Sequence, residues 1–101
     1  LLSSQLELLA LSGNQLQGTI PREIDNLTTL TSLSLDFNLL TGSIPATIGL
    51  LTRLSILELR GNRLEGTIPS EIGNLLQLNL LNARETNIEG PIPSEIGRLE
   101  W

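Results

Sequence analysis

Charged side chains recur in this sequence at a spacing of 24 residues, since Asp36, Arg60 and Arg84 follow one another at that interval. Arginine can hold a carboxylate through two parallel hydrogen bonds, and arginine and aromatic side chains carry much of the energy of protein interfaces. Further side chains of these kinds accompany the three, namely Phe37, Glu58 and Glu85. The set indicates recognition of a partner. The alternative is that the charges pair with one another on a solvated surface, where such pairs contribute little.

The residue types that most enzymes use are missing from the sequence. It has no His and no Cys, which excludes Ser/His/Asp and Cys/His nucleophile systems as well as the usual zinc and transition-metal ligand sets. It also lacks the glycine-rich motifs that cradle phosphates. We therefore expect no enzymatic activity, no cofactor and no metal site.

The charge balance narrows the class of partner. Eleven acidic residues against six Lys and Arg give a net charge of −5, which disfavours nucleic acid because phosphate backbones are bound by clustered basic side chains. No apolar run approaches the roughly 18 residues needed to cross a bilayer. We expect a protein partner, with a peptide or a polysaccharide as alternatives, and neither nucleic acid binding nor membrane insertion.

An internal repeat positions these side chains. One phrase has four copies, GTIPREID at 18–25, GSIPATIG at 42–49, GTIPSEIG at 66–73 and GPIPSEIG at 90–97. The leucines keep the same beat, at Leu6, Leu30, Leu54 and Leu78. We interpret residues 1–101 as a single segment of about four repeats, 6–29, 30–53, 54–77 and 78–101, taken from a longer protein.

Each repeat predicts one coil of a stacked structure. In the LxxLxL portion the last two leucines are two apart, so they point to the same face of a strand. One strand for each repeat cannot bury its apolar side alone, and stacking the copies gives a parallel sheet with a continuous core. The Pro after each GxI ends strand pairing, and Ile72, Leu75 and Leu78 then follow at the spacing of three that suits a 3₁₀ turn.

A repeated asparagine predicts a ladder of hydrogen bonds between coils. Asn14, Asn38 and Asn62 occupy the turn that leaves each strand, where a side-chain amide can bond to backbone groups of its own coil and of the next coil. The fourth repeat departs from this pattern, with Thr86 at the ladder position and Ala83 at an inward leucine position. We interpret these two changes as drift, with a local deformation around Arg84 and Glu85 as the alternative.

The pattern LxxLxLxxNxLxGxIPxxIGxL resembles the plant-type leucine-rich repeat of receptor-kinase ectodomains and polygalacturonase-inhibiting proteins. The resemblance implies an α/β-type repeat solenoid, a right-handed coil with a parallel β-sheet on the concave face and 3₁₀ or loop segments on the outer returns. It also implies a non-catalytic module that binds a macromolecular partner through variable residues of the concave face. Carried over to this sequence, those residues are Asp36, Phe37, Glu58, Arg60, Arg84 and Glu85.

Two other functions stay open at this point. A structural subunit of a larger assembly would use exposed outer residues such as Leu39, Leu50 and Leu76. An ice-binding solenoid would use a column of small polar residues, and the column Thr19, Ser43, Thr67 is interrupted by Pro91 at the next repeat.

One glycosylation sequon, Asn26-Leu27-Thr28, occurs in the chain. Asn26 falls in a solvent-facing position of an outer return, where a glycan fits. The sequon and the resemblance together favour an extracellular or cell-surface glycoprotein over an intracellular protein.

Overall fold

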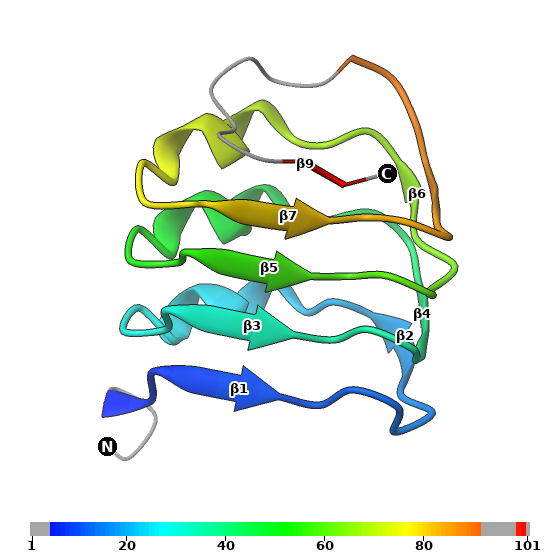
Figure 1. Ribbon diagram of the computed structural model, residues 1–101, viewed down its shortest axis with the longest axis horizontal. Helices are drawn as coiled ribbons and strands as arrows, with labels where there is room; N and C mark the ends of the chain where they lie inside the picture. Colours follow the sequence, from blue (N-terminus) through cyan, green and yellow to red (C-terminus); the bar gives the residue numbers. More distant parts are fainter. Residues whose placement is uncertain (1–4, 92–98, 101) are drawn as a thin grey trace.

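The computed structural model describes residues 5–91 and 99–100, and each repeat in it forms one coil of a solenoid (Figure 1). The strands of successive coils lie side by side in one parallel sheet, whose members in spatial order are β1 (Leu8–Ala10), β3 (Ser32–Ser34), β5 (Ile56–Glu58), β7 (Leu80–Asn82) and β9 (Leu99–Glu100). Figure 1 shows this sheet on one face and the helical segments on the other. The solenoid and its parallel sheet are therefore as predicted.

The leucine spacing sets the register of the sheet. Leu9 pairs with Leu33, Leu33 with Leu57 and Leu57 with Leu81, so that equivalent residues 24 apart lie next to one another. The last pairing differs, because Leu81 lies opposite Leu99, which is 18 residues further along the chain. The repeat spacing thus holds from β1 to β7 and is shorter at β9.

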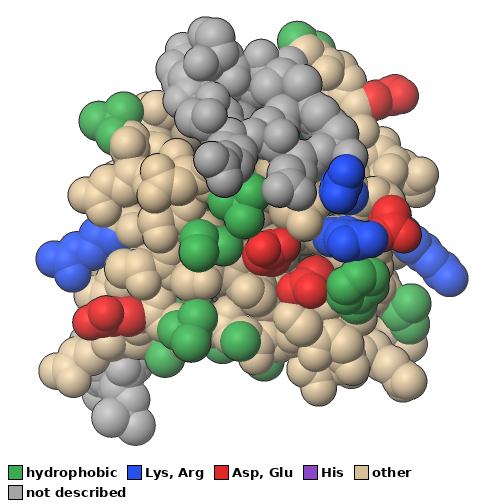
Figure 2. Space-filling model, in the orientation of Figure 1, with side chains coloured by type: hydrophobic (Ala, Val, Ile, Leu, Met, Phe, Trp, Pro, Cys, Tyr) green, Lys and Arg blue, Asp and Glu red, His purple; other side chains and the backbone are tan. Residues whose placement is uncertain are grey.

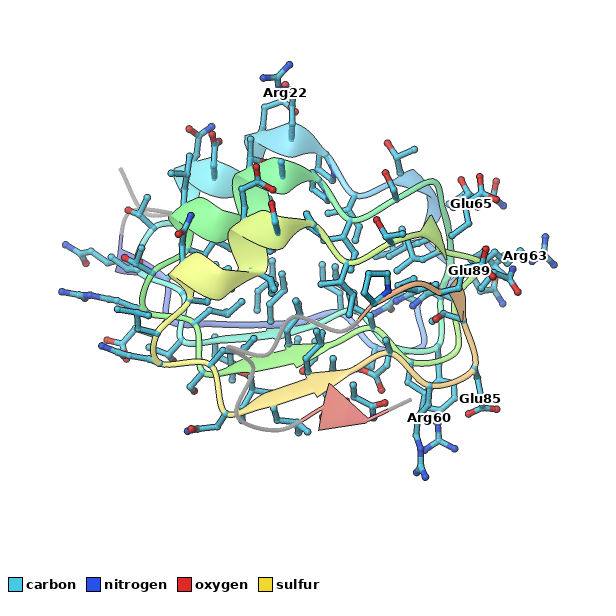
Figure 3. The ribbon with its side chains drawn as sticks, turned by 90° about the horizontal axis from the view of Figure 1, so that it is seen from above. Arg22, Arg60, Arg63, Glu65, Glu85 and Glu89 are labelled. Carbon is cyan, nitrogen blue, oxygen red and sulfur yellow. The ribbon has the colours of Figure 1, made fainter. Side chains whose placement is uncertain are left out.

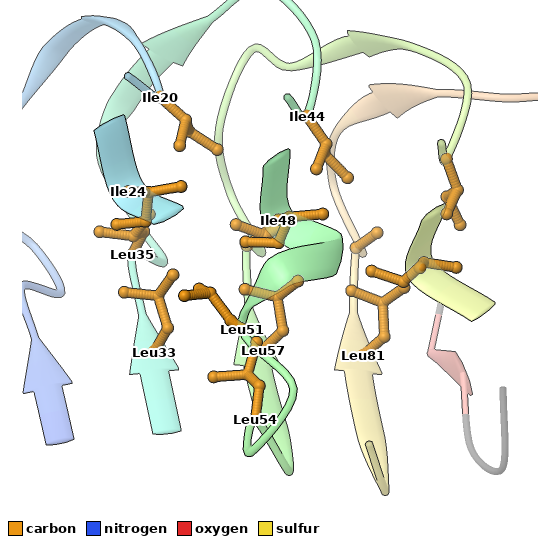
Figure 4. Close-up of a cluster of buried hydrophobic side chains, with 14 of the residues drawn as sticks. Ile20, Ile24, Leu33, Leu35, Ile44, Ile48, Leu51, Leu54, Leu57 and Leu81 are labelled. Carbon is orange, nitrogen blue, oxygen red and sulfur yellow. The ribbon is translucent and has the colours of Figure 1, made fainter. Parts of the chain in front are cut away.

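Leucine and isoleucine fill the space between the sheet and the outer returns (Figure 4). Leu33, Leu57 and Leu81 point inward from the strands with at most 1% of their surface exposed. Ile48 and Ile72 come from the outer returns and are equally buried. A continuous core runs through the stacked coils because every repeat supplies the same inward residues.

The outer returns are short 3₁₀ helices: η2 (Arg22–Asn26), η3 (Ala46–Leu50) and η4 (Ser70–Asn74). Pro21, Pro45 and Pro69 precede them with φ of −70°, −69° and −64°. Proline fixes φ in this range and lacks an N–H, so it starts the return without leaving an unpaired donor. No helix in the described residues is long and apolar enough to cross a membrane.

Two small parallel sheets between the main sheet and the helices were not predicted from the sequence. They pair β2 (Gln17–Thr19) with β4 (Leu39–Thr41), and β6 (Glu65–Gly66) with β8 (Asn87–Ile88). The side of the solenoid is closely packed here, since a Cβ added to Gly42, at φ +76°, would lie 2.9 Å from the Thr19 methyl carbon. Glycine allows the coils to approach at this point.

Asparagine side chains join the turns of consecutive coils. Asn38 is buried, and its amide nitrogen donates to the carbonyl oxygens of Leu11 and Leu35, both at 2.9 Å. Its Oδ1 accepts the backbone N–H groups of Asn14 and Leu16 at 2.9 and 3.0 Å. One side chain of the second coil thus satisfies polar backbone groups of the first.

The other ladder positions differ from one another. Asn62 repeats the pattern one coil later, donating to the Leu35 and Leu59 carbonyls. Asn14 is exposed, and its amide donates to the Ser12 carbonyl of its own coil. Thr86 donates to the carbonyl of Ala83, also in its own coil, at 2.7 Å, because a threonine hydroxyl lacks the reach of an asparagine amide.

Candidate functional site

The turn that follows each strand of the main sheet has a left-handed backbone. The residues at this repeat position are Gly13, Phe37, Gly61 and Glu85, with φ of 68°, 57°, 74° and 57°. Glycine adopts such angles at little cost, whereas a bulky side chain disfavours them. Phe37 is therefore held in a backbone conformation that its own residue type resists, and strained residues of this kind concentrate at functional sites.

The neighbouring coil fixes the Phe37 ring. The Phe37 N–H donates to the Arg60 carbonyl at 2.7 Å. The ring leans over Gly61, where an added Cβ would lie only 2.6 Å from the ring carbon Cδ1. Phe37 nevertheless remains 52% exposed. An aromatic side chain that is both seated and exposed is suited to act as an interface anchor.

Arg60 links Phe37 to the next coil. Its guanidinium carbon lies 5.4 Å from the centroid of the Phe37 ring, within the range of a cation–π contact. Its Nε donates to Oε2 of Glu85, and Figure 3 shows these two side chains together at one edge of the molecule. Phe37, Arg60 and Glu85 therefore form one connected row across three coils.

A second row lies one position nearer the strands. Asn82 donates from its amide to Oε2 of Glu58 at 3.2 Å, and its Oδ1 accepts the Arg84 backbone N–H at 3.1 Å. Asn82 is only 8% exposed. Its bonds to both residues fix the local backbone of Arg84 and the direction of the Glu58 carboxylate.

Asp36 is directed to the opposite side. Its Oδ1 accepts a hydrogen bond of 2.6 Å from the Ser12 hydroxyl, in the first coil. The predicted residues thus divide into three groups. Phe37, Arg60 and Glu85 contact one another, Glu58 and Arg84 are joined through Asn82, and Asp36 pairs with Ser12.

The binding residues expected from the sequence lie at the ends of the strands and in the turns that follow them. Figure 2 shows hydrophobic, acidic and basic side chains gathered there on the sheet face of the molecule. Sequence analysis missed Ser12, Gly61 and Asn82 as members of this surface. A glycine at two of the four turn positions was the available signal for Gly61, because it leaves room for a neighbouring side chain.

The positions connected with other functions are also accessible. Asn26 ends η2, and both Asn26 and Thr28 of the sequon are exposed. On the outer surface Leu50 is 56% exposed and Leu76 is 89% exposed. No group of three or more metal-binding side chains occurs in the described residues.

Comparison with protein families supports the interpretation of the repeat. The family model for the Leucine Rich Repeat matches residues 5–27, 29–51 and 53–75. The chain belongs to the leucine-rich repeat family.

Solved leucine-rich repeat structures superpose closely on this chain. The crystal structure of the BIR3–SERK2 complex from Arabidopsis thaliana matches with 38% identity and a TM-score of 0.84, covering 92% of this chain and 56% of that one. The Arabidopsis receptor kinase HAESA, solved in complex with the peptide hormone IDA and the co-receptor SERK1, matches with 39% identity and a TM-score of 0.89, covering 95% of this chain and 17% of that one. Receptor-kinase leucine-rich repeat ectodomains are thus among the structural relatives.

A plant ice-binding protein is also similar, with 34% identity and a TM-score of 0.78 over 82% of this chain and 27% of that one. The leucine-rich repeat segment therefore spans 56% or less of each of these three chains. Comparison with curated protein sequences gave no significant match.

Proposed function

We propose that this chain is a non-catalytic recognition segment that binds a protein partner, in particular a peptide, through the strand-end part of its sheet face. The observation that carries the proposal is Phe37, an exposed aromatic residue held in a left-handed backbone and seated on Gly61. Arg60 and Glu85 fix the ring from the next coils. A preorganised aromatic and arginine pair loses little freedom on binding, which favours affinity.

The structural relatives support a peptide or protein partner over other classes. HAESA was solved with a peptide hormone and a co-receptor, and BIR3 was solved with SERK2. The partner is recognised without being transformed, since the surface residues named above bind and orient rather than form a nucleophile with its base. The net charge of −5 disfavours nucleic acid as a partner.

The relatives also bear on where the protein acts. We infer an extracellular or cell-surface location, because receptor ectodomains are among the similar structures. The exposed sequon at Asn26 is then a glycosylation site. In this proposal the coils at 6–29, 30–53, 54–77 and 78–101 are one segment of a longer leucine-rich repeat protein.

Selection from a random peptide library tests the binding surface. Peptides recovered on the full chain are titrated calorimetrically against Phe37→Ala and Arg60→Ala, with Leu50→Ala and Leu76→Ala as controls on the outer surface. Loss of an interface anchor costs about 2 kcal/mol or more, so the first two variants should weaken binding at least about tenfold. The two controls should bind as the unchanged chain does. Recovered peptides that are insensitive to Phe37→Ala and Arg60→Ala contradict the proposal.

A structural subunit that makes contact through its outer surface is the second candidate. The exposure of Leu50 and Leu76 favours it, because large exposed apolar side chains often mark contact surfaces. The same titration separates the two functions. Binding that depends on Leu50 or Leu76 and not on Phe37 assigns the function to the outer surface.

An ice-binding role is a third candidate, favoured by the similar plant protein and by the exposed hydroxyl column Thr19, Ser43 and Thr67. Pro91 follows at the next repeat position and carries no hydroxyl, so the array is short. We expect no thermal hysteresis from the chain in freezing-point measurements. A measurable hysteresis that Thr67→Leu removes would establish this role instead.

A further inference from the structure

An open space lies beside Phe37 on the side of the first coil. Phe37 has a glycine on each side at its repeat position, Gly13 in the first coil and Gly61 in the third. The ring occupies the space over Gly61. At Gly13, by contrast, an added Cβ would find no other atom within 4 Å. One side of the Phe37 turn is therefore filled by the ring itself, and the other is free.

A carboxylate faces the same open side. Asp36 directly precedes Phe37, and its Oδ1 is bonded to the Ser12 hydroxyl of the first coil. Gly13 in turn donates its N–H to the Asp36 carbonyl at 3.0 Å. These two bonds hold Asp36 against the first coil, next to Gly13. We name the surface formed by Ser12, Gly13, Asp36 and Phe37 the Gly13 site.

The charges on the other side of Phe37 are already matched. Arg60 lies 5.4 Å from the ring centroid and forms an ion pair with Glu85. The positive charge nearest to the ring is thus offset by a carboxylate of the fourth coil. Asp36 then contributes a negative charge to the open side, on a chain whose net charge is −5. This arrangement attracts a cation.

We propose that the Gly13 site binds a basic side chain of the partner, with arginine preferred over lysine. The inference rests on the proposed peptide-binding function and specifies the chemistry of one partner residue. The alkyl stem of that residue lies over Gly13, its charged group contacts the Phe37 ring, and the Asp36 carboxylate accepts its hydrogen bonds. A guanidinium is planar, so it stacks on an aromatic ring and meets a carboxylate with two donors, which a lysine ammonium cannot do.

The test is an NMR titration of the full chain with acetyl-Gly-Gly-Arg-Gly-Gly-amide. The same peptide with citrulline is the uncharged control. The arginine peptide should shift the backbone amide signals of Ser12, Gly13 and Phe37 in a saturable manner, and the citrulline peptide should bind at least about fivefold more weakly. Shifts scattered over the acidic surface, or equal binding of both peptides, overturn the proposal.

Matched variants localise the effect. Asp36→Asn removes one charge and keeps an oxygen for Ser12, and Asp25→Asn removes the same charge from η2 on the outer return. Asp36→Asn should weaken arginine-peptide binding at least about fivefold, while Asp25→Asn should leave it within about twofold. Equal effects of the two variants overturn the proposal.

A further variant decides the question if Asp36→Asn does not fold, which its amide spectrum reveals at once. Gly13→Asn fills the open space without changing the charge, and asparagine tolerates the backbone angle of +68° at this position. It should also weaken binding at least about fivefold, and unchanged binding overturns the proposal. If library peptides depend on Phe37 but arginine peptides ignore Asp36 and Gly13, the proposed function stands and this inference fails. Library peptides that depend on Leu50 or Leu76 instead refute the proposed function, whatever the arginine peptide does.

Discussion

The outer returns and the strand-end turns repeat equally well in backbone but differently in residue type. In the returns, proline precedes every helix with ψ of 143° or 144°, and a buried isoleucine follows. In the turns, φ stays between 57° and 74° at Gly13, Phe37, Gly61 and Glu85, although these residues share no chemistry. Packing thus fixes residue and backbone together in the returns. In the turns, the asparagine that follows holds the backbone in the second and third coils and leaves the preceding side chain free to vary.

The largest effect should come from the core side of a return. Ile48→Ala removes a side chain that is 1% exposed, and deletions of this kind cost about 2–5 kcal/mol. Leu50→Ala, two residues further along, should stay within about 0.5 kcal/mol because Leu50 is 56% exposed. Urea unfolding measures both. Equal losses would mean that the outer surface is stabilising in its own right, which contradicts the division between packing and exposed residues.

The ladder should give the next largest effect. Asn38→Ala leaves buried backbone groups of two coils without partners and should lower the free energy of unfolding by about 1–3 kcal/mol. Asn14→Ala is the matched control, since Asn14 has the same type and repeat position but is exposed. It should change the free energy by less than about 0.5 kcal/mol. An Asn38 variant as stable as the Asn14 variant would contradict the assignment of the turn backbone to the ladder.

Phe37 should separate binding from stability. Asparagine tolerates a left-handed backbone, so Phe37→Asn relieves strain while it removes the ring contacts with Gly61 and Arg60. Because the two changes oppose each other, the free energy of unfolding should stay within about 1 kcal/mol. Peptide binding should fall at least about tenfold, as for loss of an anchor residue. Calorimetry and urea unfolding on the same sample check both, and a large loss of stability would identify Phe37 as a structural residue.

Thr86 should show the smallest effect. Thr86→Asn restores the amide that reaches the preceding coil, as Asn62 reaches Leu35. The free energy of unfolding should rise by up to about 1 kcal/mol, the net worth of one added hydrogen bond. Thr86→Ser is the control that keeps only the bond to Ala83. A clear destabilisation by asparagine would indicate that the turn around Arg84 and Glu85 is deformed rather than drifted.

The sequence predicted the main sheet because its signal is strict. Leu33 pairs with Leu9 and Leu57, since a period of two within each strand and of 24 between strands allows no other register with the leucines inside. The side pairing of β2 with β4 was not predictable in the same way. Gln17, Gly18 and Thr19 form no hydrophobic strand pattern, and they pair because the stacked coils bring them together.

The candidate site was predictable only in part. Repeat position placed Phe37, Arg60 and Glu85 on consecutive coils, but several carboxylates lay within range of Arg60 and only side-chain geometry selects Glu85. The left-handed backbone of Phe37 is contrary to the preference of its residue type. It follows from the turn that all coils share, which glycine at two of the four positions indicates and phenylalanine conceals.

The direction of the ladder has a consequence for synthesis. Asn38 of the second coil satisfies the Leu11 carbonyl of the first coil, and Asn62 of the third does so for Leu35 of the second. A ribosome delivers the partner of each turn one repeat of 24 residues after the turn itself. At about 5–20 residues per second this delay is roughly one to five seconds for every coil. During that interval the newest turn keeps its polar groups in water, so the nascent solenoid closes from behind, each coil being completed by its successor.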